Sequence, residues 1–163
     1  LAARAIRGQP LHCTALFNVD RLSKGDKGGN EIPLKRGKNL HPAWDNLLGR
    51  DSYLRNVDKA ALELSDKGKY GDLWASTAKE SDPRKWAAES HDIAESVVYA
   101  PAILEAVRHS PPGDKLQPID LPEDYYRAAG ELARKRVLAA GLRLANLLQH
   151  AGEGVSRKKR KVE

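Results

Sequence analysis

The chain has 163 residues, of which 40% are hydrophobic and 31% charged. This predicts one domain that can bury a core and need not be disordered. No apolar run reaches the ~18 residues of a membrane span, and the single cysteine, Cys13, excludes an internal disulfide framework and a multi-cysteine zinc site. The net charge is +6, but the last seven residues carry +4, so residues 1–156 are nearly neutral and the basic pI says little about the folded surface.

The start of the chain carries no signal-peptide pattern. The sequence contains no Met and begins at Leu1. We therefore expect that a segment upstream of Leu1 has been removed. Residues 1–40 are expected to be irregular, because Gly and Pro interrupt any helical period. Within them, residues 30–35 could form a short edge strand or hairpin arm, since Pro33 restricts a strand to a sheet edge.

Helical signals begin at Pro42, which fits the first position of a helix with His41 at or near the N-cap and Gly49 as its stop. A second helix is predicted over residues 53–64, with Gly68 beyond its end. Its expected apolar face consists of Val57, Ala61 and Leu64.

Asp82 followed by Pro83 predicts the start of a helix that runs to Tyr99, with Trp86, Ile93, Val97 and Val98 at helical spacing. Pro101 predicts a short helix to His109. Residues 110–121 read as a Pro-rich loop. The last and longest helix is predicted over residues 122–150, and its apolar stripe consists of Leu132, Val137, Ala140, Leu144 and Leu148.

The predicted fold class is therefore mainly α, with packed helices and an irregular N-terminal quarter. Two parts are expected, a helical domain over residues 1–152 and a basic, disordered tail over residues 153–163, where few apolar residues remain to pack.

A possible metal site is indicated by His41 and Asp45, which lie four residues apart and would project from one face of a helix. His12, in a loop, is the obvious third ligand. Two histidines and one carboxylate suit a zinc ion with open positions for water or substrate. The alternative is that Asp45 merely caps the helix or is solvated.

The remaining histidines offer one competing pair. His91 and Glu95 also lie four residues apart on a predicted helix. His109 and His150 fall near predicted helix C-termini, where a cation favours the helix dipole, and we interpret both as structural.

Three runs of sequence in order, Gln9-Pro10-Leu11-His12, then Asp26-Lys27-Gly28-Gly29-Asn30, then Asn39-Leu40-His41-Pro42-Ala43-Trp44-Asp45, resemble the zinc-dependent single-strand-specific nucleases. These are the S-one/P-one nucleases of the phospholipase C superfamily. Two later runs agree, Trp86-Ala87-Ala88-Glu89-Ser90 and Gly141-Leu142-Arg143-Leu144-Ala145. The resemblance covers about residues 8–150.

The resemblance implies a mainly helical fold and a cluster of three zinc ions that hydrolyses phosphodiester bonds in single-stranded DNA and RNA, often with 3′-nucleotidase activity. It implies that His12, His41 and Asp45 are the ligands of one of these zinc ions. It also implies that Gly28, Gly29 and Asn30 form the segment that contacts the nucleobase beside the scissile phosphate. Without the flanking motifs, those three residues would read as a turn.

The chain departs from the family pattern before Gln9. Ala2, Ile6 and Gly8 stand where the family has His, Asp and His, and the first two of those are zinc ligands there. The ligands for one zinc out of three therefore remain, and we interpret residues 1–152 as the truncated C-terminal part of a nuclease. The expected activity is weak or absent. The alternative is a non-catalytic helical remnant that binds one zinc and nucleotides, or a helical interaction module.

Residues 157–162, Arg-Lys-Lys-Arg-Lys-Val, resemble a nuclear import signal. The other interpretation is a solvated basic terminus, which would attract phosphates without specificity. The family resemblance implies a secreted or periplasmic protein, and the import-signal interpretation implies a nuclear one.

Overall fold

The computed structural model describes residues 8–49, 54–77, 80–111 and 114–159. Over these residues the protein is mainly helical, with six α-helices and no sheet, which confirms the predicted fold class. In chain order the elements are a 3-10 turn Pro10–His12, α2 Leu40–Asp45, α3 Leu54–Leu64, α4 Lys67–Thr77, α5 Pro83–Ile93, a π-helical turn Ala94–Val98, α6 Pro101–His109 and α7 Glu123–Lys159.

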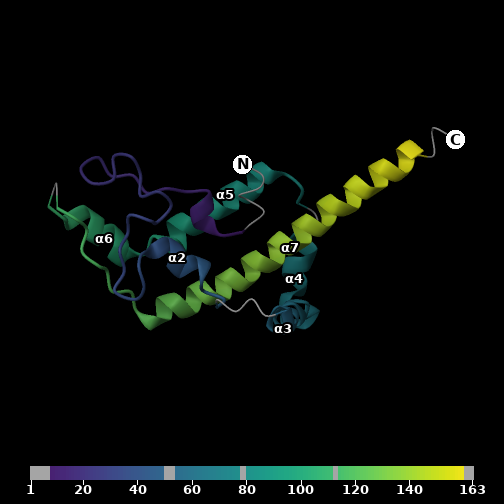
Figure 1. Ribbon diagram of the computed structural model, residues 1–163, viewed down its shortest axis with the longest axis horizontal. Helices are drawn as coiled ribbons and strands as arrows, with labels where there is room; N and C mark the ends of the chain where they lie inside the picture. Colours follow the sequence, from purple (N-terminus) through teal and green to yellow (C-terminus); the bar gives the residue numbers. More distant parts are fainter. Residues whose placement is uncertain (1–7, 50–53, 78–79, 112–113, 160–163) are drawn as a thin grey trace.

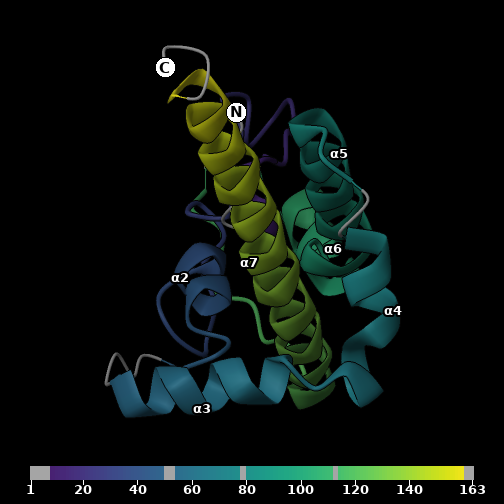
Figure 2. The same ribbon diagram turned by 90° about the vertical axis from the view of Figure 1, so that its right-hand side faces the viewer.

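The helix α7 is a long rod that crosses the whole molecule, and its C-terminal part extends beyond the other elements (Figure 1). Seen from the side in Figure 2, α2 lies on one side of α7, and α4, α5 and α6 lie on the other. The helix α4 packs directly against α7. None of the described helices is both long enough and apolar enough to cross a bilayer.

The main core lies where α2, the π-helical turn, α6 and the start of α7 meet the loop around residue 32. Ile32, Leu40, Val98 and Ile103 are fully buried there. The irregular residues 13–39 thus join the core through a few apolar side chains and form no sheet.

The helix α5 begins as the sequence predicts, because the Asp82 side chain accepts a hydrogen bond of 2.9 Å from the backbone N–H of Arg84. The helix then loosens into the π-helical turn, whose last bond runs from the N–H of Tyr99 to the carbonyl of Ala94 at 2.9 Å. This turn brings Tyr99 into the core. The predicted helix from Pro101 to His109 is α6.

Two expectations for residues 30–49 are wrong. Residues 30–35 form no strand. Pro33 pairs with Asn39 and Leu34 pairs with Ile119, and both bridges are isolated, so no ladder forms. The helix predicted from Pro42 to Gly49 is α2, which begins two residues earlier and ends at Asp45. Pro42 is tolerated inside it because the first-turn N–H groups have no partner within a helix.

The sequence prediction also lacks α4, which includes Gly68, the residue expected to lie beyond a helix end. Packing on α7 offsets the cost of two glycines in this helix. Conversely, the predicted apolar face of α3 is not buried, since Val57 and Ala61 are exposed and Leu64 is partly buried.

The longest helix differs from its prediction in two ways. It continues to Lys159, so the expected end at His150 and the expected disorder from residue 153 are wrong up to Lys159. No proline follows to stop it, and Lys, Arg and Glu sustain a helix. The predicted stripe is only partly used, because Leu132 is partly buried while Val137, Leu144 and Leu148 are exposed. Residues 160–162 of the predicted import signal lie outside the described residues.

Candidate metal centre

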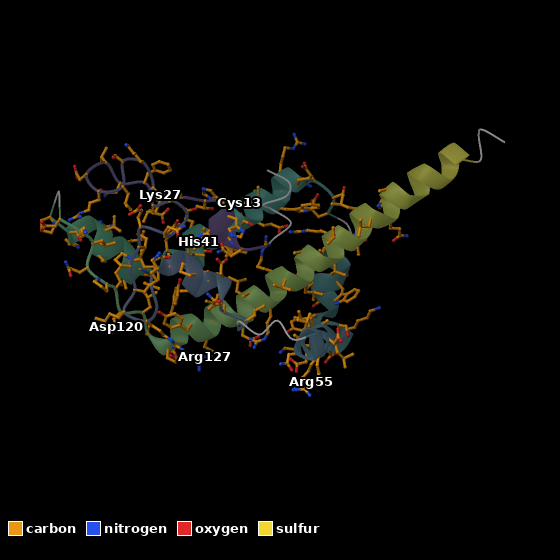
Figure 3. All side chains as sticks on the ribbon, viewed as in Figure 1. Cys13, Lys27, His41, Arg55, Asp120 and Arg127 are labelled. Atoms are coloured by element: carbon orange, nitrogen blue, oxygen red, sulfur yellow. The ribbon has the colours of Figure 1, made fainter. Side chains whose placement is uncertain are left out.

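The three predicted metal ligands lie together although they come from two elements. His12 ends the 3-10 turn, and His41 and Asp45 are on α2. Figure 3 shows the labelled His41 close to Cys13, the residue that follows His12. The rings of His12 and His41 are 5.3 Å apart between centroids. One ligand atom from each of the three residues lies within 4.8 Å of the other two.

The distances suit a small divalent ion. The Nε2 atom of His41 is 3.5 Å from Oδ2 of Asp45, and the Nε2 atom of His12 is 3.8 Å from Oδ1 of Asp45. Ligands of a tetrahedral zinc ion at ~2.0–2.1 Å lie about 3.3 Å apart, so small side-chain movements would close the site. Two imidazoles and one carboxylate are a donor set that zinc accepts and that calcium and magnesium do not prefer.

Each of the two α2 ligands is oriented by a group that is not a ligand. The Nδ1 atom of His41 lies 2.6 Å from the carbonyl oxygen of Gly28. This bond fixes Nδ1 as the protonated nitrogen and leaves Nε2 to face a metal. The side-chain amide of Gln9 donates to Oδ1 of Asp45 at 2.9 Å. Gln9 and Gly28 thus provide the outer support that metal ligands need.

The conformation of the loop at Gly28 and Gly29 depends on both residues being glycine. Their φ angles are 64° and 84°, in the left-handed region. A Cβ atom on Gly28 would lie 2.5 Å from the carbonyl oxygen of Leu11, and one on Gly29 would lie 3.2 Å from the backbone nitrogen of His41. The loop therefore packs between the two segments that carry the ligands.

Asp26 is part of the second sequence motif, but its role in holding the loop could not be assigned from the sequence. It is fully buried, and its carboxylate accepts four hydrogen bonds. The donors are the N–H groups of Leu16, Gly28 and Gly29 at 2.9–3.0 Å and the hydroxyl of Tyr99 at 2.8 Å. Burial, with Asp26 adding to it, raises the pKa of Tyr99, so this hydroxyl remains a donor. An acidic residue two positions before a Gly-Gly pair is the signal that could have identified it.

Asn30, the last residue of the predicted nucleobase segment, is exposed, whereas Gly28 and Gly29 are buried. The Asn30 side-chain amide donates to the carbonyl of Lys27 at 2.9 Å, which closes the turn. The residue faces solvent beside the loop that orients His41.

A cavity of about 190 Å³ is lined by two of the three candidate ligands, His12 and Asp45. Trp44, Leu48 and the α7 residue Val137 also line it. The Trp44 ring is fixed by its Nε1–H, which donates to the Tyr125 hydroxyl at 2.8 Å. A substrate group could therefore reach an ion at this site through a partly apolar opening.

The other histidines do not form a second metal site within the described part of the chain. His91 and Glu95 are both exposed, and no third ligand joins them. His109 lies in the last turn of α6, as predicted, with Nδ1 3.0 Å from the carbonyl of Glu105. The predicted place of His150 near a helix C-terminus is wrong, because α7 continues to Lys159.

Comparison with protein families gives one match. A family model described as S1/P1 Nuclease matches residues 8–153, a range that contains the 3-10 turn, the Gly-Gly loop, α2 and all three ligands. Comparisons with curated proteins and with solved structures give no match.

Proposed function

The chain belongs to the S1/P1 nuclease family, and on this premise we propose that it binds one zinc ion through His12, His41 and Asp45 and uses it to hydrolyse phosphodiester bonds of single-stranded DNA or RNA. The observation that carries the proposal is the approach of one ligand atom from each residue to within 4.8 Å of the others. The family is zinc-dependent, and its substrates are nucleic acids.

A zinc ion with three protein ligands supplies a Lewis acid for a phosphoryl oxygen and lowers the pKa of a bound water to about 7. The residues of this chain would hold and orient the reacting groups around it. Gly28 keeps the His41 ring in one tautomer, and Gln9 keeps one Asp45 oxygen engaged, so the other is available to the ion.

We further propose that Gly28, Gly29 and Asn30 contact the nucleobase next to the bond that is cleaved. The Gly-Gly backbone lets a base approach closely, and the exposed Asn30 amide can hydrogen-bond to a base edge. The same loop bonds to His41, so a base held there would place its phosphate near the ion. The segment that positions the substrate and the segment that positions the metal are therefore one piece of backbone.

The expected rate is low. The described residues contain one group of three metal ligands, and one ion cannot hold both the attacking and the leaving oxygen, as paired metal sites do. Each ~1.4 kcal/mol of lost transition-state stabilisation costs a factor of ten in rate. We therefore propose weak hydrolysis, with 3′-nucleotides as a second substrate class.

The alternative function is zinc and nucleotide binding without catalysis. The one ligand group found among the described residues favours it, as do Ala2 and Ile6, which stand where the family pattern has two zinc ligands, His and Asp. S1/P1 nucleases are typically secreted, and we propose the same location for this chain. The import-signal interpretation of residues 157–162 would instead give nuclear accumulation of a fluorescent fusion.

Metal analysis and cleavage assays test the two functions. The protein as purified with zinc should contain about one zinc per chain, and His41→Ala and Asp45→Ala should remove it, whereas His109→Ala, outside the group, should not. Zinc-loaded protein should cleave a labelled single-stranded oligonucleotide slowly, and a chelator or His12→Ala should abolish this. Stoichiometric zinc without any cleavage would support the binding function, and no bound zinc would refute both.

A further inference from the structure

Two buried arginines of α7 bind the same partly exposed glutamate of α5. Arg136 and Arg143 are only 7% and 3% exposed. Arg136 donates to one Glu89 oxygen at 2.8 Å, and Arg143 donates to both at 2.6 and 2.7 Å. Burial alone would raise the pKa of Glu89, but the hydrogen bonds from Arg143 and Arg136 outweigh it, and the pKa lies below its ordinary value. The glutamate is therefore charged at neutral pH.

The two arginines differ in what else they bind. Arg143 stacks over the Trp86 ring, with 5.1 Å from its guanidinium carbon to the ring centroid. Arg136 uses its other donors on Ser90 Oγ at 2.9 Å and on the carbonyl oxygen of Gly8 at 3.1 Å. Arg136 thus ties α5 and α7 to a residue four positions before His12, while Arg143 ties the two helices to each other.

Gly8 also lies close to the main chain of α7, in addition to its bond with the Arg136 side chain. Its φ angle is 72°, and a Cβ atom on Gly8 would lie 2.8 Å from the backbone carbonyl oxygen of Arg136. The backbone at Gly8 is thus held between the Arg136 side chain and the Arg136 main chain. Directly after it come Gln9, which binds Asp45, and the 3-10 turn that ends at His12.

We propose that Arg136 is a positioning residue of the metal centre, which fixes the segment 8–12 so that His12 reaches the two α2 ligands. The inference rests on the proposed metal binding by His12, His41 and Asp45. His12 is the one ligand that α2 does not carry, so its distance from the other two depends on what holds this segment. Ligand distances must hold to within about 0.2 Å, and a small displacement of residue 8 would therefore remove one ligand.

A guanidinium is required for this role. Its planar fork donates in several directions at once, and here it donates to a carboxylate, a hydroxyl and a carbonyl. A lysine at position 136 keeps the positive charge beside Glu89 but cannot hold all three groups in that geometry. Arg143→Lys is the matched control, because it makes the same change at the same glutamate without a bond to Gly8.

Cobalt(II) titration of the full chain tests the proposal. Bound Co²⁺ absorbs visible light, and the intensity rises as the number of ligands falls from six to four, so the spectrum reports both affinity and geometry. Arg136→Lys should weaken Co²⁺ binding about 10- to 100-fold, the usual effect of losing outer-shell support, and should change the absorption of the bound ion. Arg143→Lys should keep the Co²⁺ affinity within about twofold of wild type and leave the absorption spectrum of the bound ion unchanged. This should hold even if Arg143→Lys lowers the melting temperature as much as Arg136→Lys does.

A Co²⁺ affinity and a spectrum in Arg136→Lys that match those of wild type would overturn the proposal. An equal loss of Co²⁺ affinity in Arg136→Lys and Arg143→Lys would also overturn it, because the network would then have a purely structural role. If Arg136→Lys does not fold, Gly8→Ala is the variant that tests the proposal. It keeps both arginines but pushes residue 8 away from α7. That variant should also weaken Co²⁺ binding, and unchanged binding would overturn the inference. A wild-type protein that binds no Co²⁺ would instead refute the proposed metal site itself.

Discussion

Replacing Asp26 by Asn should destabilise the protein more than any other change of a single atom near the metal centre. The carboxylate is fully buried, and each of its two oxygens accepts two hydrogen bonds. Asn has one oxygen, so its NH₂ group would face two of the four donors. Two buried donors without an acceptor, at ~1–3 kcal/mol each, give a loss of about 2–6 kcal/mol in the free energy of unfolding.

Urea unfolding at pH 7, followed by far-UV circular dichroism, measures this loss. Tyr99→Phe is the control, because it removes one of the four donors and leaves the carboxylate with three, for an expected loss of about 1 kcal/mol. Zinc affinity should fall in Asp26→Asn as well, since the Gly28 carbonyl that orients His41 belongs to the same loop. An Asp26→Asn protein within 0.5 kcal/mol of wild type, a margin typical of exposed sites, would refute the reasoning.

Two further predictions concern the network at Glu89 and the core. The pKa of Glu89 is lowered in the folded state, so its contribution to stability is present above the unfolded value of ~4.3 and is lost as the pH falls through the folded pKa. The stability of Glu89→Gln, measured by urea unfolding from pH 7 to pH 3, should therefore be lower at pH 7 and change less on acidification, and parallel curves would contradict this. Leu40→Ala, at a fully buried position, should cost about 2–5 kcal/mol, whereas Val137→Ala, at a side chain that is 45% exposed, should cost less than ~1 kcal/mol in the same assay. Equal costs would show that the stripe on α7 is buried in solution.

The helices with strong local signals could be predicted from the sequence. Asp82 caps α5 and Pro101 opens α6, and both depend on chemistry within one turn. The helix α4 could not be predicted in this way, because its glycines oppose a helix locally and its packing against α7 is a tertiary interaction. The end of α2 was also misjudged, since Gly49 terminates a turn that follows the helix rather than the helix itself.

The buried face of α7 shows the limit of apolar periodicity. The face that pairs with α5 contains Arg136 and Arg143, while Val137, Leu144 and Leu148 of the predicted stripe are exposed. A period search treats arginine as a surface residue and cannot detect that Glu89 on another helix pairs with it. The role of Asp26 was missed for the same reason, because its hydrogen-bond donors come from three separate stretches of the chain.

The sequence could predict that the three candidate ligands lie close together, but not what holds them. The spacing of His41 and Asp45 needs only a helix, and His12 follows from the family resemblance. Their support comes from non-ligands, namely the carbonyl of Gly28 behind His41 and the amide of Gln9 behind Asp45.

These contacts join the three sequence motifs into one hydrogen-bonded unit. Asp26 fixes the Gly-Gly loop, the loop bonds to α2 through His41, and α2 bonds back to the segment before His12 through Gln9. A change in any one motif is therefore transmitted to the three candidate ligands, which lie in the first and the third motif. For this reason zinc affinity should fall in Asp26→Asn and in Arg136→Lys, although neither residue is among the three ligands. An unchanged binding constant in both variants would mean that neither the Gly-Gly loop nor the segment 8–12 depends on these residues to position the ligands.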